Sequence, residues 1–472
     1  MVPQPLRIIG GLDSGLVALV LDDARRLVGE VGLEIELPAL LKELAAHPGV
    51  TVKGNRACYS EELFERARKQ VPDEDTNYAS SKLGDERFRV VGPFSPFEVI
   101  DFETGAKRPA EERDLVEGAR LYDALGVAGP VHVNLGSLDP RVQPIRIAKL
   151  CAENSRAVGN WSPAFSYEQA VCIRDMFLAA GRPEPHVAFQ MTHSPLRLDS
   201  YSLDILMRLR KSDSGLKGIT AGGGAMPLAG VSAPIYWRAA AAQGLAECIG
   251  GWITAKLIDP AIHPYASFQT WCPDLATCKW TQATPEAIGF DLLTRALMRE
   301  ALGLNLYAAC GNVDRMTLSA LSGARIFECA GEREERFSLA HVAVDLEKVN
   351  FVAAALGGTG IPACHSGDRQ ECLSHQPGLA TRIVKETFPE TSFLAHESTA
   401  SYRDVLWQPA VFEGKGAVQV AEMLRADSPE LLPASREFAR RKIAGNDFAL
   451  PRDVAREVER IYDRGIRAVE AQ

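Results

Sequence analysis

The sequence predicts an α/β protein, namely a TIM-type (β/α)8 barrel with an N-terminal helical segment and a C-terminal helical extension. Two observations predict this fold class. Short apolar segments alternate with helical stretches over more than about 200 residues, which indicates a parallel sheet, and so many repeats favour a barrel. The chain also has 472 residues, 46% of them hydrophobic. That is enough for one large α/β domain with added helices, or for two domains.

The N-terminal segment, residues 1–110, begins with helical patterns. Apolar residues recur at every third or fourth position in three stretches, and Pro38 and Ser60 suit the start of the second and the third. The three predicted helices are residues 13–31, 38–46 and 60–69. Short strand-like pieces follow at residues 88–91 and 97–100. This segment is expected to pack on the barrel.

The barrel is expected within residues 111–400, and a helical extension within residues 401–472. Seven short apolar segments fit barrel strands. They are residues 131–135, 157–160, 186–190, 218–220, 265–270, 305–309 and 324–328. The eighth strand is unassigned. In such a barrel the active site is built from residues that directly follow the strands.

A glycine-rich stretch, residues 222–235, follows one of these strands and precedes an Ala-rich helical run, residues 239–257. Glycines let a ligand approach the backbone, while Pro227 and Pro234 end the flanking elements. A strand, a glycine loop and the free N–H groups of a helix together indicate a ligand-binding corner. Many α/β proteins have similar connections without a ligand, so the pattern alone leaves both interpretations open.

Residues at the strand ends supply the candidate site. The expected substrate-binding residues are Asn134, Trp161, Gln190, Gly223, Met226, Trp271 and Tyr307. The expected acid/base residues are His193, Asp314 and Glu328. Three aromatic rings at one mouth would attract a quaternary ammonium group by about 0.5–2 kcal/mol per contact. Packing of loops and capping of the core explain the same positions equally well.

The ten cysteines of the chain are expected to be reduced thiols, since no secretion signal is visible. Cys272, Cys310 and Cys329 follow strands and are candidate zinc ligands, which bind at about 2.3 Å. They come singly, without a Cys-x-x-Cys pair, so buried apolar thiols are the preferred interpretation. A second set permits a metal by its spacing, but a surface loop is preferred there. It comprises Cys364, His365, Cys372 and His375.

Charge and hydropathy exclude some classes of partner. The net charge of −9 argues against nucleic acid or an anionic membrane surface as a partner. No window approaches the roughly 18 uninterrupted apolar residues of a transmembrane helix. A cytoplasmic protein is expected, and a homo-oligomer is compatible with the sequence.

Several blocks along the chain resemble the trimethylamine methyltransferase family, the corrinoid-dependent methyltransferases of methylated amines. The most specific block is Met-Pro-Leu-Ala-Gly-Val-Ser-Ala-Pro at residues 226–234. The others are residues 30–35, 58–63, 101–105 with Arg108 and Pro109, 194–199, 393–399 and 407–409. These blocks extend over nearly the whole chain.

The resemblance implies a barrel that binds a methylated amine at its mouth, where a separate corrinoid protein docks and its Co(I) accepts the methyl group. The trimethylamine branch of the family carries a pyrrolysine on the loop after the sixth strand. Here the interval from Leu306 to Gly323 is shorter than is usual in that family, and the sequence has no pyrrolysine. A quaternary amine such as a betaine is therefore the expected donor, since it is already activated and needs mainly orientation and desolvation.

Two alternatives stay open at this point. One is a zinc-dependent methyltransferase of the same barrel type that uses Cys272, Cys310 and Cys329. The other is a non-catalytic binding protein for cationic amines, in which a ligand would stabilise the fold without turnover.

Overall fold

The structure is a computed structural model. It describes residues 12–74, 80–82, 88–92, 96–127, 129, 133–156, 163–213, 215–277, 284–357, 379–387, 396–397, 407–412 and 414–471. Trp161, the segment 364–375 and most of the block 393–399 lie outside the described residues. Among the described helices, none has the length and apolar character needed to cross a membrane.

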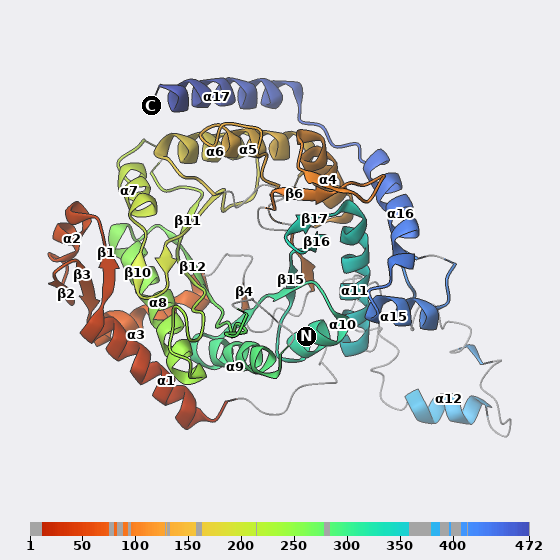
Figure 1. Ribbon diagram of the computed structural model, residues 1–472, viewed down its shortest axis with the longest axis horizontal. Helices are drawn as coiled ribbons and strands as arrows, with labels where there is room; N and C mark the ends of the chain where they lie inside the picture. Colours follow the sequence, from red (N-terminus) through yellow and green to blue (C-terminus); the bar gives the residue numbers. More distant parts are fainter. Residues whose placement is uncertain are drawn as a thin grey trace.

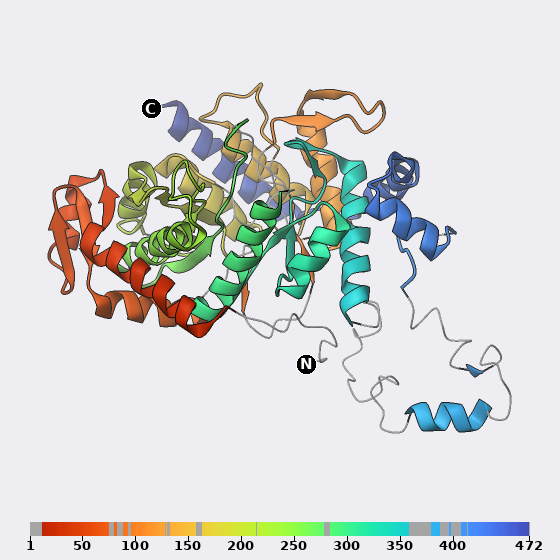
Figure 2. The same cartoon turned by 60° about the horizontal axis from the view of Figure 1, so that its bottom comes forward.

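The N-terminal segment combines three helices with a small sheet. Its elements are α1 (Ser14–Arg26), a π-helical turn (Leu27–Val31), β1 (Leu33–Ile35), α2 (Pro38–Leu44), β2 (Val50–Lys53), β3 (Arg56–Tyr59) and α3 (Glu61–Glu74). The three predicted helices are confirmed, and the strands between them were not predicted. β1 pairs in parallel with β10 (Arg197–Leu198), so the sheet runs β2-β3-β1-β10-β9, with β9 at Thr192–His193. Figure 2 shows this sheet at the opposite end of the molecule from α15 and α16.

The central strands confirm five of the seven predicted segments. They are β8 (Val187–Gln190), β11 (Ile219–Ala225), β12 (His263–Phe268), β13 (Leu304–Leu306), β14 (Ala308–Ala309) and β15 (Ile326–Glu328). The segment 157–160 lies outside the described residues, and residues 133–135 of the first segment are described but form no strand. β8, β11 and β12 form a parallel sheet, in which β11 lies in the middle.

The last predicted strand has an unexpected neighbour. β15 pairs in parallel with β5 (Arg89–Val90), which lies more than two hundred positions upstream, and β4 (Ser80–Lys82) pairs with β13. The 88–91 piece thus occupies the place beside β15 where an eighth barrel strand is expected. A fourth small sheet runs β16 (Glu332–Arg333), β17 (Arg336–Phe337), β6 (Glu98–Ile100) and β7 (Lys107–Pro109).

The α/β class is confirmed, but a closed eight-stranded barrel is not shown. The described strands pair into five separate sheets, and no ladder joins β12 to β13 among them. What the structure shows is a mixed α/β fold with several short sheets, and the closed barrel stays a prediction. The helices from α4 to α11 lie around the central strands (Figure 1). They are α4 (Glu112–Leu125), α5 (Gln143–Asn154), α6 (Tyr167–Ala179), α7 (Ser200–Leu209), α8 (Trp237–Ile258), α9 (Pro285–Leu302), α10 (Val313–Leu321) and α11 (Leu339–Gly357).

The predicted C-terminal helices are present and pack on the outside of this ring. The remaining elements are α12 (Leu379–Thr387), α15 (Ala417–Arg425), a 3-10 turn (Pro429–Leu431), α16 (Leu432–Ala444) and α17 (Arg452–Glu470). α16 lies against α11 and α4, and α17 lies along α6 and α5 (Figure 1).

The apolar interior is divided into two clusters of buried side chains. One contains side chains from the N-terminal segment, from the sheet of β8, β11 and β12, and from helices such as α8 and α17. The other gathers β5, β15, α4, α11 and α16. α5 contributes to both, with Ile145 in the first cluster and Ile147 in the second. The candidate site lies in the first half of the molecule, that is, the part built around the first cluster. The second half is the part built around the second cluster.

Candidate functional site

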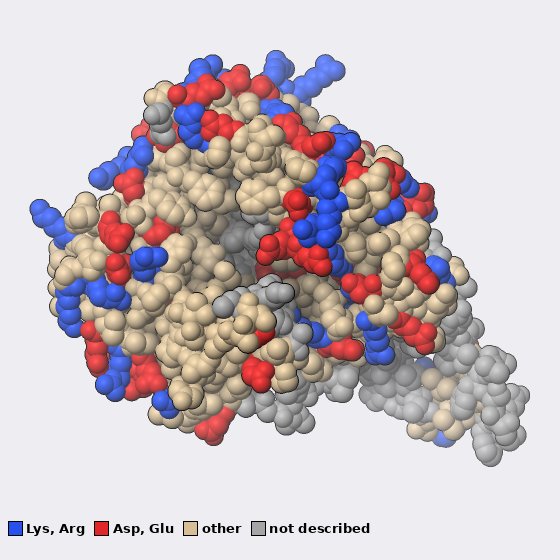
Figure 3. All heavy atoms as spheres, viewed as in Figure 1, with Lys and Arg blue, Asp and Glu red and all other residues tan. Residues whose placement is uncertain are grey.

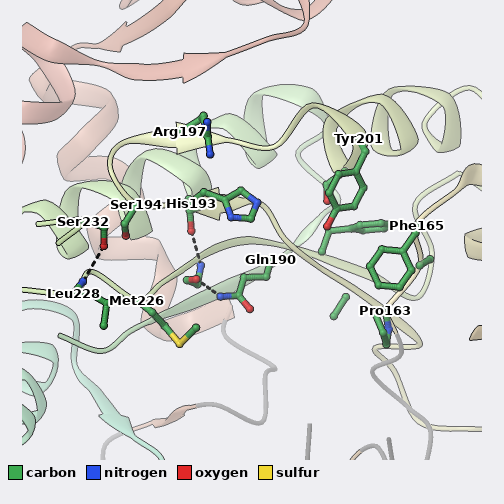
Figure 4. Close-up of a pocket in the computed structure, with 16 residues that line it drawn as sticks. Pro163, Phe165, Gln190, His193, Ser194, Arg197, Tyr201, Met226, Leu228 and Ser232 are labelled. Carbon is green, nitrogen blue, oxygen red and sulfur yellow. Dashed lines mark hydrogen bonds between the residues drawn. The ribbon is translucent and has the colours of Figure 1, made fainter. Parts of the chain in front are cut away.

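A cavity of about 640 Å³ lies at the carboxyl ends of β8 and β11. This volume is in the range of small-molecule sites. It is lined by three of the predicted residues, Gln190, His193 and Met226, which come from the ends of these two strands and the segments that follow them. Figure 4 shows how the lining side chains are arranged.

Hydrogen bonds join the neighbouring strand ends that line the cavity. The Gly224 N–H donates to Thr192 Oγ1 at 2.9 Å, and the Gln190 side-chain amide donates to the Gly224 carbonyl. Figure 4 draws both contacts as dashed lines. Because the side-chain amide of Gln190 is held against the backbone, its carbonyl oxygen is left to accept a hydrogen bond from a ligand.

The glycine run, residues 222–224, belongs to a strand rather than to a loop. β11 extends through residues 219–225 and is buried along its whole length. Alternate residues of a strand face opposite sides, so Gly224 lines the cavity while Gly223 faces α8. A Cβ on Gly223 would lie 2.3 Å from the Cys248 Cα. The predicted ligand-binding role of Gly223 stays a prediction; its observed surroundings are those of close strand–helix packing.

Two basic side chains lie on one side of the cavity. His193 in β9 and Arg197 in β10 are paired across the two antiparallel strands. Directly opposed residues of such a pair project from the same face of the sheet, and both line the cavity. None of the described lining residues is Asp or Glu. Within the described part of the chain, the Arg197 guanidinium makes no ion pair.

Two aromatic rings lie on another side. Phe165 and Tyr201 have ring centroids 6.2 Å apart and are tilted by 40°. They are 58% and 45% exposed, which is high for large apolar residues. Phe165 directly precedes Ser166, which caps α6, and Tyr201 lies in the first turn of α7. Aromatic faces of this kind attract alkylammonium groups.

Trp271, Tyr307 and Asn134 do not line this cavity. Trp271 lies with Cys272 beside a second cavity of about 10 Å³, large enough for one water molecule. Tyr307 lies between β13 and β14, where its carbonyl accepts a hydrogen bond from Arg295. The Asn134 N–H donates to the Pro96 carbonyl at 2.8 Å.

Glu328, Cys310 and Cys329 gather at the ends of β14 and β15. The Cys310 N–H donates to the Glu328 carbonyl at 2.7 Å. Burial raises the pKa of Glu328 well above its usual range, with Glu332 adding to the effect. Burial also raises the pKa of both thiols well above the usual range.

The proposed metal set and the predicted acids are therefore spread over the molecule. Cys272 lines the small cavity, apart from the pair at β14 and β15. Among the described residues, no group of three or more His, Cys, Asp or Glu side chains is arranged to hold a metal ion. Asp314 lies in the first turn of α10, is 73% exposed and contacts Arg425 at 3.6 Å. Neither Asp314 nor Glu328 lines the large cavity.

The cavity also contains residues that strand-end reasoning missed. Arg197, Phe165 and Tyr201 come from a tight two-strand turn and from helix starts, not from the ends of the central strands. One signal was present in the sequence, since Arg197 belongs to the block 194–199 that carries the family resemblance.

No family model and no curated protein matches the chain. Solved structures resemble it over nearly its whole length at low identity. The monomethylamine methyltransferase MtmB of Methanosarcina barkeri is 12% identical, with 100% of this chain and 90% of that chain covered and a TM-score of 0.46. The hydroxylamine complex of MtmB is 13% identical, with 94% and 91% covered and a TM-score of 0.44. HydG, a maturase of the [FeFe]-hydrogenase, is 12% identical, with 96% and 93% covered and a TM-score of 0.35. These likenesses assign no activity to the chain.

Proposed function

We propose that this protein is a methyltransferase that moves a methyl group from a zwitterionic, betaine-like quaternary amine to the Co(I) of a corrinoid protein. The sequence blocks that resemble the corrinoid-dependent methyltransferases support the reaction class. The composition of the cavity supports the choice of donor.

The observation that carries the proposal is the division of the cavity into two kinds of wall. Phe165 and Tyr201 offer ring faces to a methylated ammonium, while His193 and Arg197 offer donors to an anion. A guanidinium binds a carboxylate through two parallel hydrogen bonds. A ligand with a quaternary ammonium at one end and a carboxylate at the other matches both walls. A simple cation would meet Arg197 with no Asp or Glu among the described residues that line the cavity.

Methyl transfer from a quaternary ammonium needs little acid/base catalysis. The carbon–nitrogen bond breaks, its electron pair stays on the nitrogen, and the donor leaves as a neutral tertiary amine. The methyl group bonds to the nucleophilic acceptor, which supplies the electron pair of the new bond. Because a quaternary ammonium has no proton to lose, binding in a defined orientation and exclusion of water are the main demands.

A protein acceptor needs access to the donor. Met226, Val231 and Tyr236 follow β11 and are 54%, 67% and 78% exposed, which gives the segment beyond the cavity an apolar surface. Figure 3 shows a hollow near the centre of the face that is viewed there. Uncharged side chains predominate on the side of β11 and β12, and charged ones gather over β16 and β17. Exposed apolar surface of this kind favours contact with a protein partner.

The test has a binding arm and a turnover arm. Binding of glycine betaine, tetramethylammonium and acetate is measured by isothermal titration calorimetry. Glycine betaine should bind at least about tenfold more tightly than either single-charge probe, because only it satisfies both walls. The protein is then mixed with glycine betaine and cob(I)alamin, and methylcobalamin formation is followed by absorbance.

Failure of each arm has a different meaning. If neither glycine betaine nor other carboxylated quaternary amines bind, the donor assignment is wrong. Binding without methylcobalamin, with either free or protein-bound corrinoid, would replace the transferase with a binding protein for such amines.

A further inference from the structure

A carboxyl group on α8 is buried behind the cavity. Glu247 is fully buried and accepts three hydrogen bonds. Ser194 Oγ donates to it at 2.7 Å, the Leu196 N–H at 2.8 Å and the Gln243 side-chain amide at 2.9 Å. Because a buried carboxyl without partners is strongly unfavourable, these three donors fix its place.

Two of the donors belong to the turn that carries the two basic side chains. Ser194 and Leu196 lie between His193 and Arg197. Leu196 has a φ of 48°, in the left-handed region that is unfavourable for a residue with a branched side chain. Glu247 accepts the N–H of this strained residue and so helps to hold the turn in that conformation.

The third donor connects Glu247 with a second loop. Gln243 lies one turn earlier on α8, and its side-chain amide also donates to the Ser232 carbonyl at 2.8 Å. Ser232 Oγ accepts from the Leu228 N–H at 3.0 Å. Figure 4 places Ser194 and Ser232 at the same end of the cavity. The pair on α8 therefore connects the 193–198 turn with the 226–233 loop, and both line the cavity.

We propose that Glu247 and Gln243 are positioning residues that fix Arg197 relative to the 226–233 loop and so determine selectivity for a ligand with an anionic end. The identity of that ligand rests on the proposed function. The two residues do not line the cavity and act only through the backbone and side chains that they hold.

Two substitutions at one position separate shape from hydrogen bonding. In Glu247→Gln, one oxygen still accepts from Leu196 and Gln243, and the new amide can donate to the Ser194 hydroxyl, which is able to accept. In Glu247→Leu, all three donors lose their acceptor. Gln243→Met removes the hydrogen bonds of Gln243 to Glu247 and to the Ser232 carbonyl, while Ser194 and Leu196 keep their acceptor. It serves if Glu247→Leu yields no folded protein.

Amide hydrogen exchange tests the connection without any ligand. In Glu247→Leu the amides of residues 193–198 and of 226–233 should exchange at least about tenfold faster than in the wild type, because local opening becomes easier. Glu247→Gln should exchange like the wild type in both loops. Unchanged exchange of both loops in Glu247→Leu, or in Gln243→Met where that variant replaces it, would overturn the proposal.

Ligand selectivity tests the consequence. The ratio of the dissociation constants of tetramethylammonium and glycine betaine should fall at least about tenfold in Glu247→Leu and stay within about twofold in Glu247→Gln. Adding Arg197→Ala to Glu247→Leu should lower the ratio little further, because the two substitutions disable the same contact.

The outcomes distinguish the two proposals. A loss of stability in Glu247→Leu with an unchanged selectivity ratio would make Glu247 a purely structural residue and overturn the inference. If the wild type binds neither probe, the proposed function fails, and hydrogen exchange still decides whether α8 holds the two loops.

Discussion

In the proposed function, Arg197 gives the cavity its preference for a ligand with an anionic end. It lies across from His193 in β9 and β10, and no acidic side chain lines the cavity among the described residues. Arg197→Ala should weaken binding of glycine betaine about 10- to 100-fold, the cost of a lost charge-assisted hydrogen bond. Binding of tetramethylammonium should not weaken, because that cation gains nothing from a guanidinium. Calorimetry measures both.

The matched control is Arg460→Ala, which removes an exposed arginine that pairs with Glu457 on α17. It should leave both affinities unchanged. Equal losses for the two probes in Arg197→Ala would show that the arginine supports the shape of the cavity and does not recognise an anion.

Glu328 predicts a pH dependence of stability. Burial raises the pKa of its carboxyl well above the usual 4.5, so the folded state favours the protonated form. The folded state then binds more protons than the unfolded state, and the stabilisation is complete below pH 4.5 and is lost as the pH rises through the raised pKa. In Glu328→Gln the free energy of unfolding should therefore decline less steeply above pH 4.5 than in the wild type.

Urea unfolding at a series of pH values measures this difference. Asp314→Asn is the control, since the Asp314 side chain is 73% exposed. Parallel profiles for Glu328→Gln and the wild type would contradict the assignment of a buried, protonated carboxyl at the end of β15.

At the scale of elements, the glycines of β11 allow α8 to lie close to the sheet. A Cβ at Gly223 would meet three backbone atoms of Cys248 at 2.3 to 2.8 Å. Backbone cannot move aside as a side chain can, so Gly223→Ala should lower the free energy of unfolding by about 1–3 kcal/mol or more. Gly289→Ala in α9 is the control, because nothing lies within 4 Å of its added Cβ. It should raise stability by up to about 1 kcal/mol through helix propensity.

Equilibrium unfolding in urea compares the two variants. If Gly223→Ala leaves the free energy of unfolding unchanged, β11 and α8 separate easily. The proposed packing role of the glycine run would then be wrong.

The sequence was sufficient for elements with strong local patterns. Five of the predicted strand segments and the helices α1, α2 and α8 follow from apolar runs and periodicity. The pairing of β1 with β10 was not predictable, because it joins residues about 160 positions apart whose local patterns do not refer to one another. The strand-end rule identified Gln190, His193 and Met226. It missed Phe165 and Tyr201, because helix starts and not central strand ends carry them.

At the scale of the whole molecule, two clusters of buried side chains support different parts of the fold. Glu347 on α11 belongs to the second half, where it is fully buried and accepts from Trp407 Nε1 at 3.1 Å and the Val411 N–H at 2.8 Å. Glu347→Ala leaves both donors unsatisfied, a cost of about 1–3 kcal/mol each. Hydrogen exchange should accelerate in α11 and residues 407–412, while α8, β11 and the affinity for glycine betaine should change little.

Glu347→Gln keeps an acceptor for only one of the two N–H donors, because its amide nitrogen cannot accept, so exchange should accelerate less than in Glu347→Ala. Equal acceleration in α8 and α11 would show that the two halves unfold as one cooperative unit.

The pairing of β5 with β15 has a consequence for synthesis of the chain. Residues 89–90 leave the ribosome long before residues 326–328, which supply the partner edge in the folded protein. During that interval the edge of β5 has no native partner in β15, and unpaired strand edges are sites of misassembly. Only after residues 326–328 have been made can β5 pair with β15. Completion of the fold therefore belongs to the end of translation, whatever forms before it.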